Sequence, residues 1–438
     1  MQKHYFKASC SVLLIASPWA GAAALYEDAH TSIKARLQGA AGVFHSGQSY
    51  NQAGVRDQGR VDWQEATLQY GLDLKHRLQG GGEAYGALDW VSSASFGEGD
   101  AAGWSLGNER TTKIENAYVG WRSGELFSAL GENGVDLSTG RQTVVVGDGF
   151  LIAGDALNIG NGLLDGETNR GGAYYLTGRR AFDRTAILRL GGTQGWRGDL
   201  MWLKSDNPAQ ASPELAVATL EQVAEPGTLG LTYIKVTDTD RALAEPLFPE
   251  RKGMQLYSLR AQGSAGVANL LLAGEHAWER KDSGAENAWY LEAGWTFAQW
   301  PGKPSINYRY SRFSEGYDPL FYGNGRALGT WFQGEVASNY AGPFNSNTAV
   351  NHIGLKASVT EQLKVGALLY QFDTLETRLG NRDARELDIY AEWAIDEHWT
   401  VLPLVGFYKP QHSVQEGGSQ IGNTRTNTYA QLLLAWTY

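Results

Sequence analysis

The sequence is poor in the residues that cross-link or chemically modify a folded chain. It contains 1 cysteine, 3 methionines and 12 prolines among 438 residues. The cysteine, Cys10, lies in the apolar N-terminal segment, and removal of that segment would leave no thiol for a disulfide. Lys and Arg (37) are outnumbered by Asp and Glu (47), so the chain shows no basic excess and no nucleic-acid partner is expected.

Long apolar runs and recognisable catalytic motifs are also missing. After the N-terminal segment, no stretch approaches the roughly 20 uninterrupted apolar residues that a membrane helix requires. The sequence has no Gly-x-Ser-x-Gly and no His-Glu-x-x-His, so it predicts no catalytic residue, no metal site and no cofactor. The stretch 147–162 lacks the Gly-Lys-Ser/Thr ending of a phosphate loop, and Asp148, Asp155 and Asp165 miss the spacing of a calcium loop. A loosely bound Ca²⁺ in this loop stays open as an alternative.

The N-terminus has the three parts of a secretory signal. MQKHYFK is short and basic, ASCSVLLIASPWA is apolar, and AGAAA offers small residues for cleavage, most plausibly after Ala24. The sequence therefore predicts a signal peptide over 1–24 and a single mature domain over 25–438. An exported chain without a membrane helix leaves three classes: a secreted or periplasmic β-protein, a surface-layer protein, or a barrel in the bacterial outer membrane.

The abundant residues are those typical of strands and tight turns, with 55 Gly, 21 Tyr and 15 Trp. Apolar residues alternate with polar ones over 33–43, 66–75, 287–297 and 386–395. In the first of these, Ile33, Leu37 and Val43 share one face, whereas Lys34 and Arg36 share the other. A soluble sandwich would alternate in the same way, so periodicity alone does not decide between a protein core and lipid.

Two further features favour a membrane barrel. Aromatic residues fall near strand ends on the apolar face, as Trp295, Phe297, Trp393, Trp399 and Trp436 do, which is typical of an interfacial girdle. Connections also alternate in length. Short ones at 263–266, 301–303, 360–362 and 396–398 alternate with long polar ones at 45–62, 93–110, 145–183, 238–252, 314–350, 374–385 and 409–427.

These turns predict an all-β fold, a transmembrane antiparallel β-barrel of about 18 strands with short periplasmic turns and long extracellular loops. The predicted spans are 31–44, 63–77, 83–92, 111–122, 134–144, 184–191, 198–205, 214–223, 227–237, 253–262, 267–279, 286–297, 304–313, 351–359, 362–373, 386–395, 398–408 and 428–438.

The chain ends on TYAQLLLAWTY, with Leu434, Trp436 and Tyr438 on one apolar face. A last strand with this pattern can face lipid and pair with the first strand to close the ring. Such an ending is also similar to the signal read by the outer-membrane assembly machinery, which we therefore expect as a partner.

Several stretches, in order, resemble the alginate export family of outer-membrane porins. They are GRQTVVVGDGFL (140–151), SINYRYSRF with YDPLFYG (305–323), WFQGEVASN (331–339), NHIGLKASVTEQLKVGALLYQF (351–372), ELDIYAEWAIDEHW (386–399) and VGFYKP (405–410). The resemblance implies an 18-stranded barrel with a charged lumen through which an anionic polysaccharide leaves the cell. Lys34 and Arg141 match basic positions of the family, whereas Glu115, Thr143, Gln333, Leu402 and Leu404 stand where it has or favours basic residues. Fewer cations imply weaker selection of anions.

The candidate selectivity residues are basic side chains on the polar face. They are Lys34, Arg36, Lys75, Arg141, Arg309 and Lys356, with Lys364 as a further member. Asp73, Glu275, Glu292, Asp388 and Glu392 share that face, so the same cations could simply pair across strands and stiffen the wall.

The loop 313–347 is too long and too aromatic for a simple connector. It could fold inward as a constriction on which sugars stack, or pack as a surface flap. The residues assigned to this constriction are Tyr317, Asp318, Tyr322, Trp331, Phe332, Gln333 and Glu335.

The leading interpretation is an integral outer-membrane channel that contacts lipid and passes a hydrophilic solute or polysaccharide. Two rivals remain. A barrel lipase or protease would place a Ser or Asp beside His276 or His412, and an adhesin-like barrel would have a plugged lumen.

Overall fold

The computed structural model describes residues 23–156 and 171–438. The predicted signal peptide lies outside the described residues except for Ala23 and Ala24, so it stays a prediction. In the described part, no helix has the length and apolar character needed to span a membrane.

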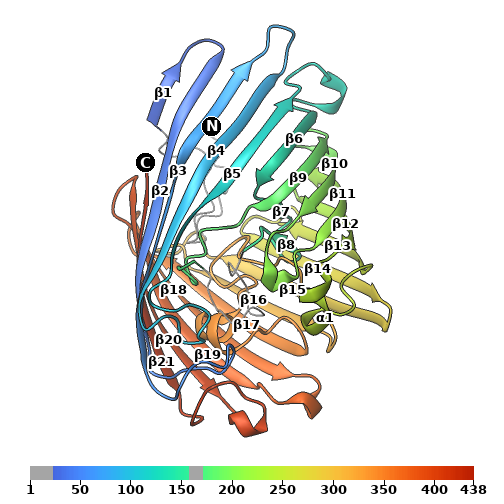
Figure 1. Ribbon diagram of the computed structural model, residues 1–438. Helices are drawn as coiled ribbons and strands as arrows, with labels where there is room; N and C mark the ends of the chain where they lie inside the picture. Colours follow the sequence, from blue (N-terminus) through green and yellow to red (C-terminus); the bar gives the residue numbers. More distant parts are fainter. Residues whose placement is uncertain (1–22, 157–170) are drawn as a thin grey trace.

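Eighteen antiparallel strands form one closed ring, which confirms the predicted fold and strand number. Each wall strand pairs with its neighbour in the chain, and the ring closes where the last strand pairs with the first (Figure 1). The wall strands are β2 (Thr31–Ser46), β3 (Val61–Arg77), β4 (Glu83–Gly97), β5 (Arg110–Arg122), β6 (Val135–Gln142), β9 (Phe182–Leu190), β10 (Gly195–Lys204), β11 (Glu214–Ala224), β12 (Gly227–Asp238), β13 (Gln255–Gly263), β14 (Leu270–Lys281), β15 (Gly284–Thr296), β16 (Ser305–Phe313), β17 (Thr348–Ser358), β18 (Leu363–Thr374), β19 (Ala384–Ala394), β20 (Trp399–Pro410) and β21 (Asn427–Thr437).

The seam of the ring involves three segments on one strand. Strand β21 pairs with β2 from Ser46↔Tyr429 to Gln38↔Thr437. The short strand β1 (Ala23–Glu27) pairs with the rest of the same β2 edge, from Ala35 to Ser32, and brings the sheet to 19 strands. Every barrel strand therefore has two neighbours, as a wall in lipid requires.

The two ends of the barrel differ as the sequence predicts. The end with short connections, which we call the turn end, lies toward the top of Figure 1 and carries β1 and the C-terminus. The opposite loop end carries the long connections 143–181 and 314–347, and a helix α1 (Arg241–Leu247). Residues 123–134 are an exception, because this turn-end connection is longer than predicted and contains a 3₁₀ turn, Ser128–Leu130.

Burial along the wall is the reverse of that in a soluble protein. On β15, Leu291 is 64% exposed and faces outward, whereas its neighbour Glu292 is 6% exposed and faces inward. The same alternation places Leu200, Leu231 and Ile389 on the outside. Outward apolar side chains with inward charges are expected when lipid surrounds the wall and polar groups line its interior.

The aromatic residues near the turn end face outward as predicted. Trp295, Trp393 and Trp399 are exposed on the outer face, and Trp399 packs beside Trp436 with ring centroids 5.8 Å apart. Amphipathic rings at this height suit the boundary between hydrocarbon and headgroups.

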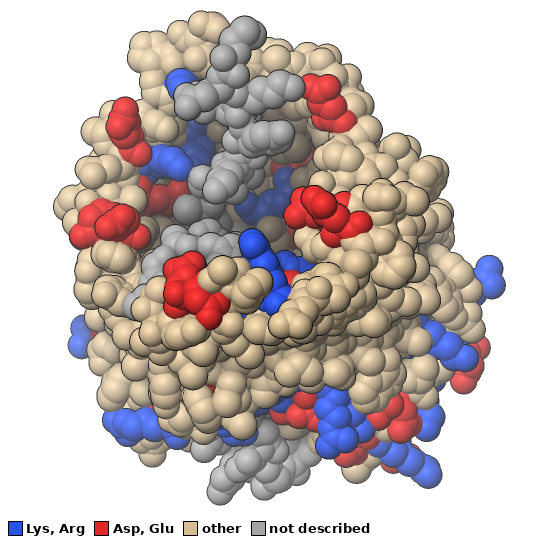
Figure 2. All heavy atoms as spheres, turned by 90° about the horizontal axis from the view of Figure 1, so that it is seen from above, with Lys and Arg blue, Asp and Glu red and all other residues tan. Residues whose placement is uncertain are grey.

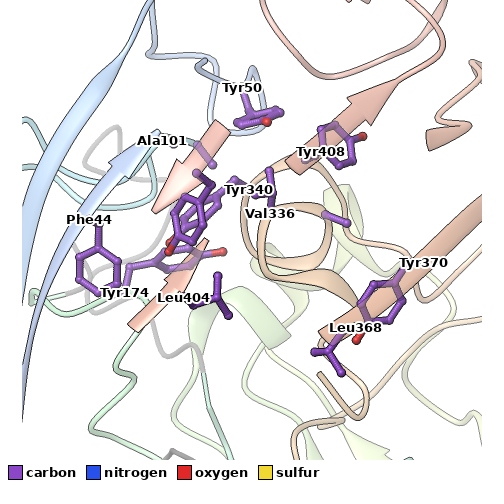
Figure 3. Close-up of a cluster of buried hydrophobic side chains, with 14 of the residues drawn as sticks. Phe44, Tyr50, Ala101, Tyr174, Val336, Tyr340, Leu368, Tyr370, Leu404 and Tyr408 are labelled. Carbon is purple, nitrogen blue, oxygen red and sulfur yellow. The ribbon is translucent and has the colours of Figure 1, made fainter. Parts of the chain in front are cut away.

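The prediction of a polar inner face holds only for part of the interior. Toward the loop end, inward residues such as Phe44, Leu404 and Tyr408 are apolar and buried against the loops (Figure 3). A second buried cluster joins Met201, Ile234 and other wall residues to the loop segments 144–152 and 317–331. The loops fill this half of the barrel, so these inward positions pack as a core and do not contact a water column.

The orientation of the wall can be tested at Leu291, which lies mid-strand on the outer face. We expect Leu291→Arg to lower the free energy of unfolding in lipid vesicles by about 2–4 kcal/mol, because a cation would then contact hydrocarbon. Tryptophan fluorescence during denaturant titration measures this change. Leu379→Arg, in an exposed loop outside the wall, is the control, and equal effects of the two substitutions would contradict the assigned faces.

Candidate functional site

Carboxylates on the inner wall hold the long loops by their backbone. Three buried glutamates on different strands each accept hydrogen bonds from two consecutive loop N–H groups. Glu65 on β3 accepts from Tyr175 and Leu176 at 2.8 and 3.0 Å, Glu115 on β5 from Arg180 and Ala181 at 2.7 and 2.8 Å, and Glu386 on β19 from Val336 and Ala337, both at 2.7 Å. Hydrogen bonds to a charged acceptor contribute about 1.5–3 kcal/mol each, so these glutamates are strong anchors.

A π-helix, Gly334–Ala341, is the most deeply buried part of the loop 314–347. Its first amides meet Glu386, and the Glu335 N–H lies 3.4 Å from the Asp388 carboxylate. Val336 and Tyr340 point from this helix into the cluster shown in Figure 3. The helix therefore closes part of the barrel interior against β18, β19 and β20.

The side chain of Glu335 links the two long loops. The Tyr175 hydroxyl donates to it at 2.5 Å, and the Tyr175 hydroxyl accepts from Gln431 of β21 at 3.0 Å. Burial raises the pKa of Glu335 to about 7, although the Tyr175 hydrogen bond opposes that shift. This carboxyl therefore holds a proton more tightly than an exposed glutamate does.

Trp331 and Asp148 form a second junction between the same loops. The Phe150 and Trp331 rings lie 4.7 Å apart, and Arg326 bridges Asp148 at 3.0 Å and the wall residue Glu292 at 2.5 Å. Backbone pairing between Ile152 and Phe321 joins the loops directly. The loops thus form one packed body inside the wall.

The predicted constriction residues lie in this body, but most are packed. Trp331, Gln333 and Glu335 are at most 2% exposed, and Tyr317 is 4% exposed. Asp318 is buried and pairs with Arg251, whose Nε donates at 2.8 Å. The proposed stacking of sugars on Tyr317 and Trp331 is therefore wrong for this arrangement, because neither ring is accessible.

Tyr322 and Phe332 are the two ring-bearing residues of that prediction that keep partial exposure. Their rings pack against each other with centroids 5.2 Å apart. Only these two rings of the predicted set therefore remain partly accessible to a solute.

Arg309 faces inward as predicted but is enclosed. Its guanidinium lies 4.6 Å from the centre of the Trp331 ring and donates to the Gly329 carbonyl at 3.1 Å. Glu292 lies 3.8 Å away. This arginine supports the loop body and does not line accessible space.

Toward the turn end, the inner wall is charged and partly exposed. Arg36 bridges Asp73 at 2.6 Å and Asp89 at 3.2 Å, and Lys356 pairs with Glu392 at 2.7 Å. Lys34, Lys75 and Lys364 also face inward here and are partly exposed. Seen from this end, the molecule is hollowed, with Lys and Arg side chains inside the hollow and acidic ones around its edge (Figure 2).

A second charged group, the Arg141 cluster, lies beside the loop body and draws its residues from β5, β6, β9 and the adjoining loops. Arg141 pairs with Asp183 at 3.1 Å and Asp206 at 3.0 Å, and Arg179 shares Asp206 at 3.0 Å. Lys113 is exposed on the same side of β5 as the buried Glu115. The cluster keeps both signs of charge in contact with accessible space.

The enzyme alternative concerns His276 and His412. His276 lies on the outer face of β14, where its ring contacts Trp278 at 4.0 Å, so it faces the surroundings of the barrel. Ser413 follows His412, but its hydroxyl donates to Glu416. Among the described residues no cluster of three or more His, Cys, Asp or Glu could hold a metal ion; Asp165 of the calcium alternative lies outside them.

Sequence reasoning missed the anchoring role of Glu65, Glu115 and Glu386. It treated inward acids as partners of cations, because alternation shows which face a residue takes but not what packs against it. Their one visible signal is a carboxylate at an inward position near the loop end of a strand, next to buried aromatic residues.

Comparison with known proteins identifies the fold of the chain but no sequence family. No family model matches the chain, and no curated protein sequence matches it. Solved structures do match. A BenF-like porin from Pseudomonas fluorescens Pf-5 has a TM-score of 0.60 at 9% identity, covering 92% of this chain and 98% of that one. OccAB1 of Acinetobacter baumannii has 0.60 at 10% identity (96% and 98%), and OccK5 (OpdH) of Pseudomonas aeruginosa has 0.59 at 9% identity (92% and 97%).

The chain has the fold of an outer-membrane porin. Coverage above nine tenths of both chains means that the whole barrel is shared. These identities are too low to carry substrates across, and none of these three structures is an alginate export porin.

The anchoring of the π-helix gives a testable expectation. Glu386→Ala should raise hydrogen exchange at the amides of 334–341 by about tenfold or more, because two hydrogen bonds to a carboxylate are lost. Mass spectrometry of deuterated peptides measures this. Glu392→Ala, which removes an inward carboxylate bonded to Lys356, should leave these amides protected; equal protection in both variants would refute the anchoring role.

Proposed function

We propose that this protein is an integral outer-membrane channel that admits small hydrophilic solutes. The observation that carries the proposal is the inverted wall, with apolar residues outside and a charged, hollowed interior at the turn end. The shared porin fold supports the same conclusion. Such a channel needs no energy of its own, because the solute diffuses along polar side chains.

We infer that the solute passes the charged turn-end wall and then the Arg141 cluster. The exposed fractions support this route, since the Arg36 side chain is 28% exposed and Asp206 is 35% exposed. Glu386 and Glu65 fix the loops to other strands of the wall, and Glu115 holds the loop next to Arg141. The partly exposed carboxylates of Asp183 and Asp206 support a route along this side of the anchored loop.

The loop body favours a small solute over a polymer. A polysaccharide needs a continuous open lumen, whereas the π-helix and the Trp331 junction fill the loop-end half of this one. Export of alginate, which the sequence resemblance implies, would require the whole body to leave the barrel. We therefore assign small polar solutes as the first class to test, with uronates, neutral sugars and amino acids compared by liposome swelling.

Conductance of the purified protein in a planar bilayer tests the channel itself. We expect stable single-channel currents, and we expect deletion of residues 330–343 to raise them severalfold, because the π-helix would no longer fill the lumen. Trp331→Ala should give a smaller increase with the loop retained. Removal of Thr377–Leu379 from a surface loop is the control, and absence of any current in all variants would overturn the proposal.

Ion selectivity tests the Arg141 cluster. Arg141→Ala removes one cation beside Asp183 and Asp206, so the reversal potential in a salt gradient should shift toward cation preference. Lys34→Ala should shift it in the same direction. Arg280→Gln removes the same charge from the outer face of β14 and should have no effect. An unchanged potential in Arg141→Ala would show that this cluster does not lie on the route.

A further inference from the structure

The outer face carries two like charges side by side at the loop end of β19 and β20. Arg385 and Lys409 are directly opposite in the antiparallel register, and both are exposed. Cross-strand neighbours of this kind have Cβ atoms about 4.5–5.5 Å apart, and like charges at that distance destabilise a sheet. A third cation, Arg425, lies in the adjoining loop next to Thr424, whose carbonyl accepts from Lys409.

Neither Arg385 nor Lys409 forms an ion pair with a carboxylate within residues 23–156 and 171–438. The nearby Asp373 accepts instead from the Gln371 amide at 3.0 Å. We call Arg385, Lys409 and Arg425 the β19–β20 basic row.

A second like-charge pair on the outer face has carboxylates beside it. Arg184 and Lys204 are also directly opposite each other near the loop end. Here Asp183 lies 3.4 Å from Arg184, and Glu214 lies 2.6 Å from Lys204. The Arg184–Lys204 pair therefore has carboxylate partners within the chain, whereas the Arg385–Lys409 pair has none in the part of the chain that the structure describes.

The register also fixes the height of the basic row. The next outward pair toward the turn end is Leu387↔Phe407, followed by Ile389↔Val405, so the row lies directly at the edge of the apolar band. Long basic side chains can lay their methylene stems on such a band while the charged ends reach the headgroup layer. Anionic headgroups attract cations at this position.

We propose that the β19–β20 basic row binds the phosphate of a phosphorylated lipid in the outer leaflet, with lipid A as the chemical type. Arginine presents a planar fork of donors that matches a phosphate, and the adjacent lysine adds a point charge. The lipid phosphate supplies the counter-charge that the chain omits. The inference rests on the proposed membrane location but not on solute passage.

Native mass spectrometry of the full protein in detergent, titrated with bis-phosphorylated lipid A, tests the proposal. We expect Arg385→Gln with Lys409→Gln to weaken lipid binding about tenfold or more, since each basic residue near an anionic surface contributes measurably. Arg184→Gln with Lys204→Gln removes the same number of charges from the neutralised pair and should change binding by less than about twofold. Circular dichroism checks that both variants keep the barrel.

Equal loss in the two double variants, or none in either, would overturn the proposal. So would undiminished binding of dephosphorylated lipid A, or displacement of the lipid by millimolar inorganic phosphate, since either result separates the site from a lipid phosphate. Conductance of the variant with Arg385→Gln and Lys409→Gln should equal that of the unmodified protein. If the protein fails to bind lipid A but conducts normally, the lipid site is refuted and the proposed channel function is not.

Discussion

The wall of this protein is one strand thick and separates two environments, and this constraint determines the rest of the structure. Neighbouring residues such as Leu291 and Glu292 must face opposite sides of it. Closure of β21 on β2 is required because an open edge in lipid would leave backbone groups without partners. Charged residues can therefore lie in the middle of strands, and the apolar residues that would form the core of a soluble protein lie outside.

The long loops fill space in the interior of the barrel. A ring of this size leaves room that side chains of the wall alone do not fill. The loop segments 143–156, 171–181 and 314–347 occupy it, with Trp331 and Tyr340 completing two apolar clusters. Their polar backbone would be costly to bury without partners, and Glu65, Glu115 and Glu386 supply acceptors from three strands. Apolar contacts and backbone hydrogen bonds thus both hold the packed loops inside the wall.

The sequence was sufficient to predict the strands of the wall and their faces, but it was insufficient to predict how the interior packs. Alternation in residues 66–75 and 287–297 predicts strands and faces, because both depend on near neighbours in the chain. The contacts of Arg309 with Trp331, or of Arg141 with Asp206, join residues far apart in sequence, and no local pattern encodes them. The inward direction of Arg309 was predictable, whereas its enclosure depended on how the loop folds.

The glutamate anchors bind loop amides, and every residue except proline carries an amide. Val336 or Tyr175 could therefore be exchanged for another side chain without loss of the hydrogen bond that fixes the loop at that point. The scaffold thereby separates where a loop is attached from which chemical groups it displays. Descendants of such a barrel could acquire a different inner lining through changes in the loops alone, while the attachment points stay the same.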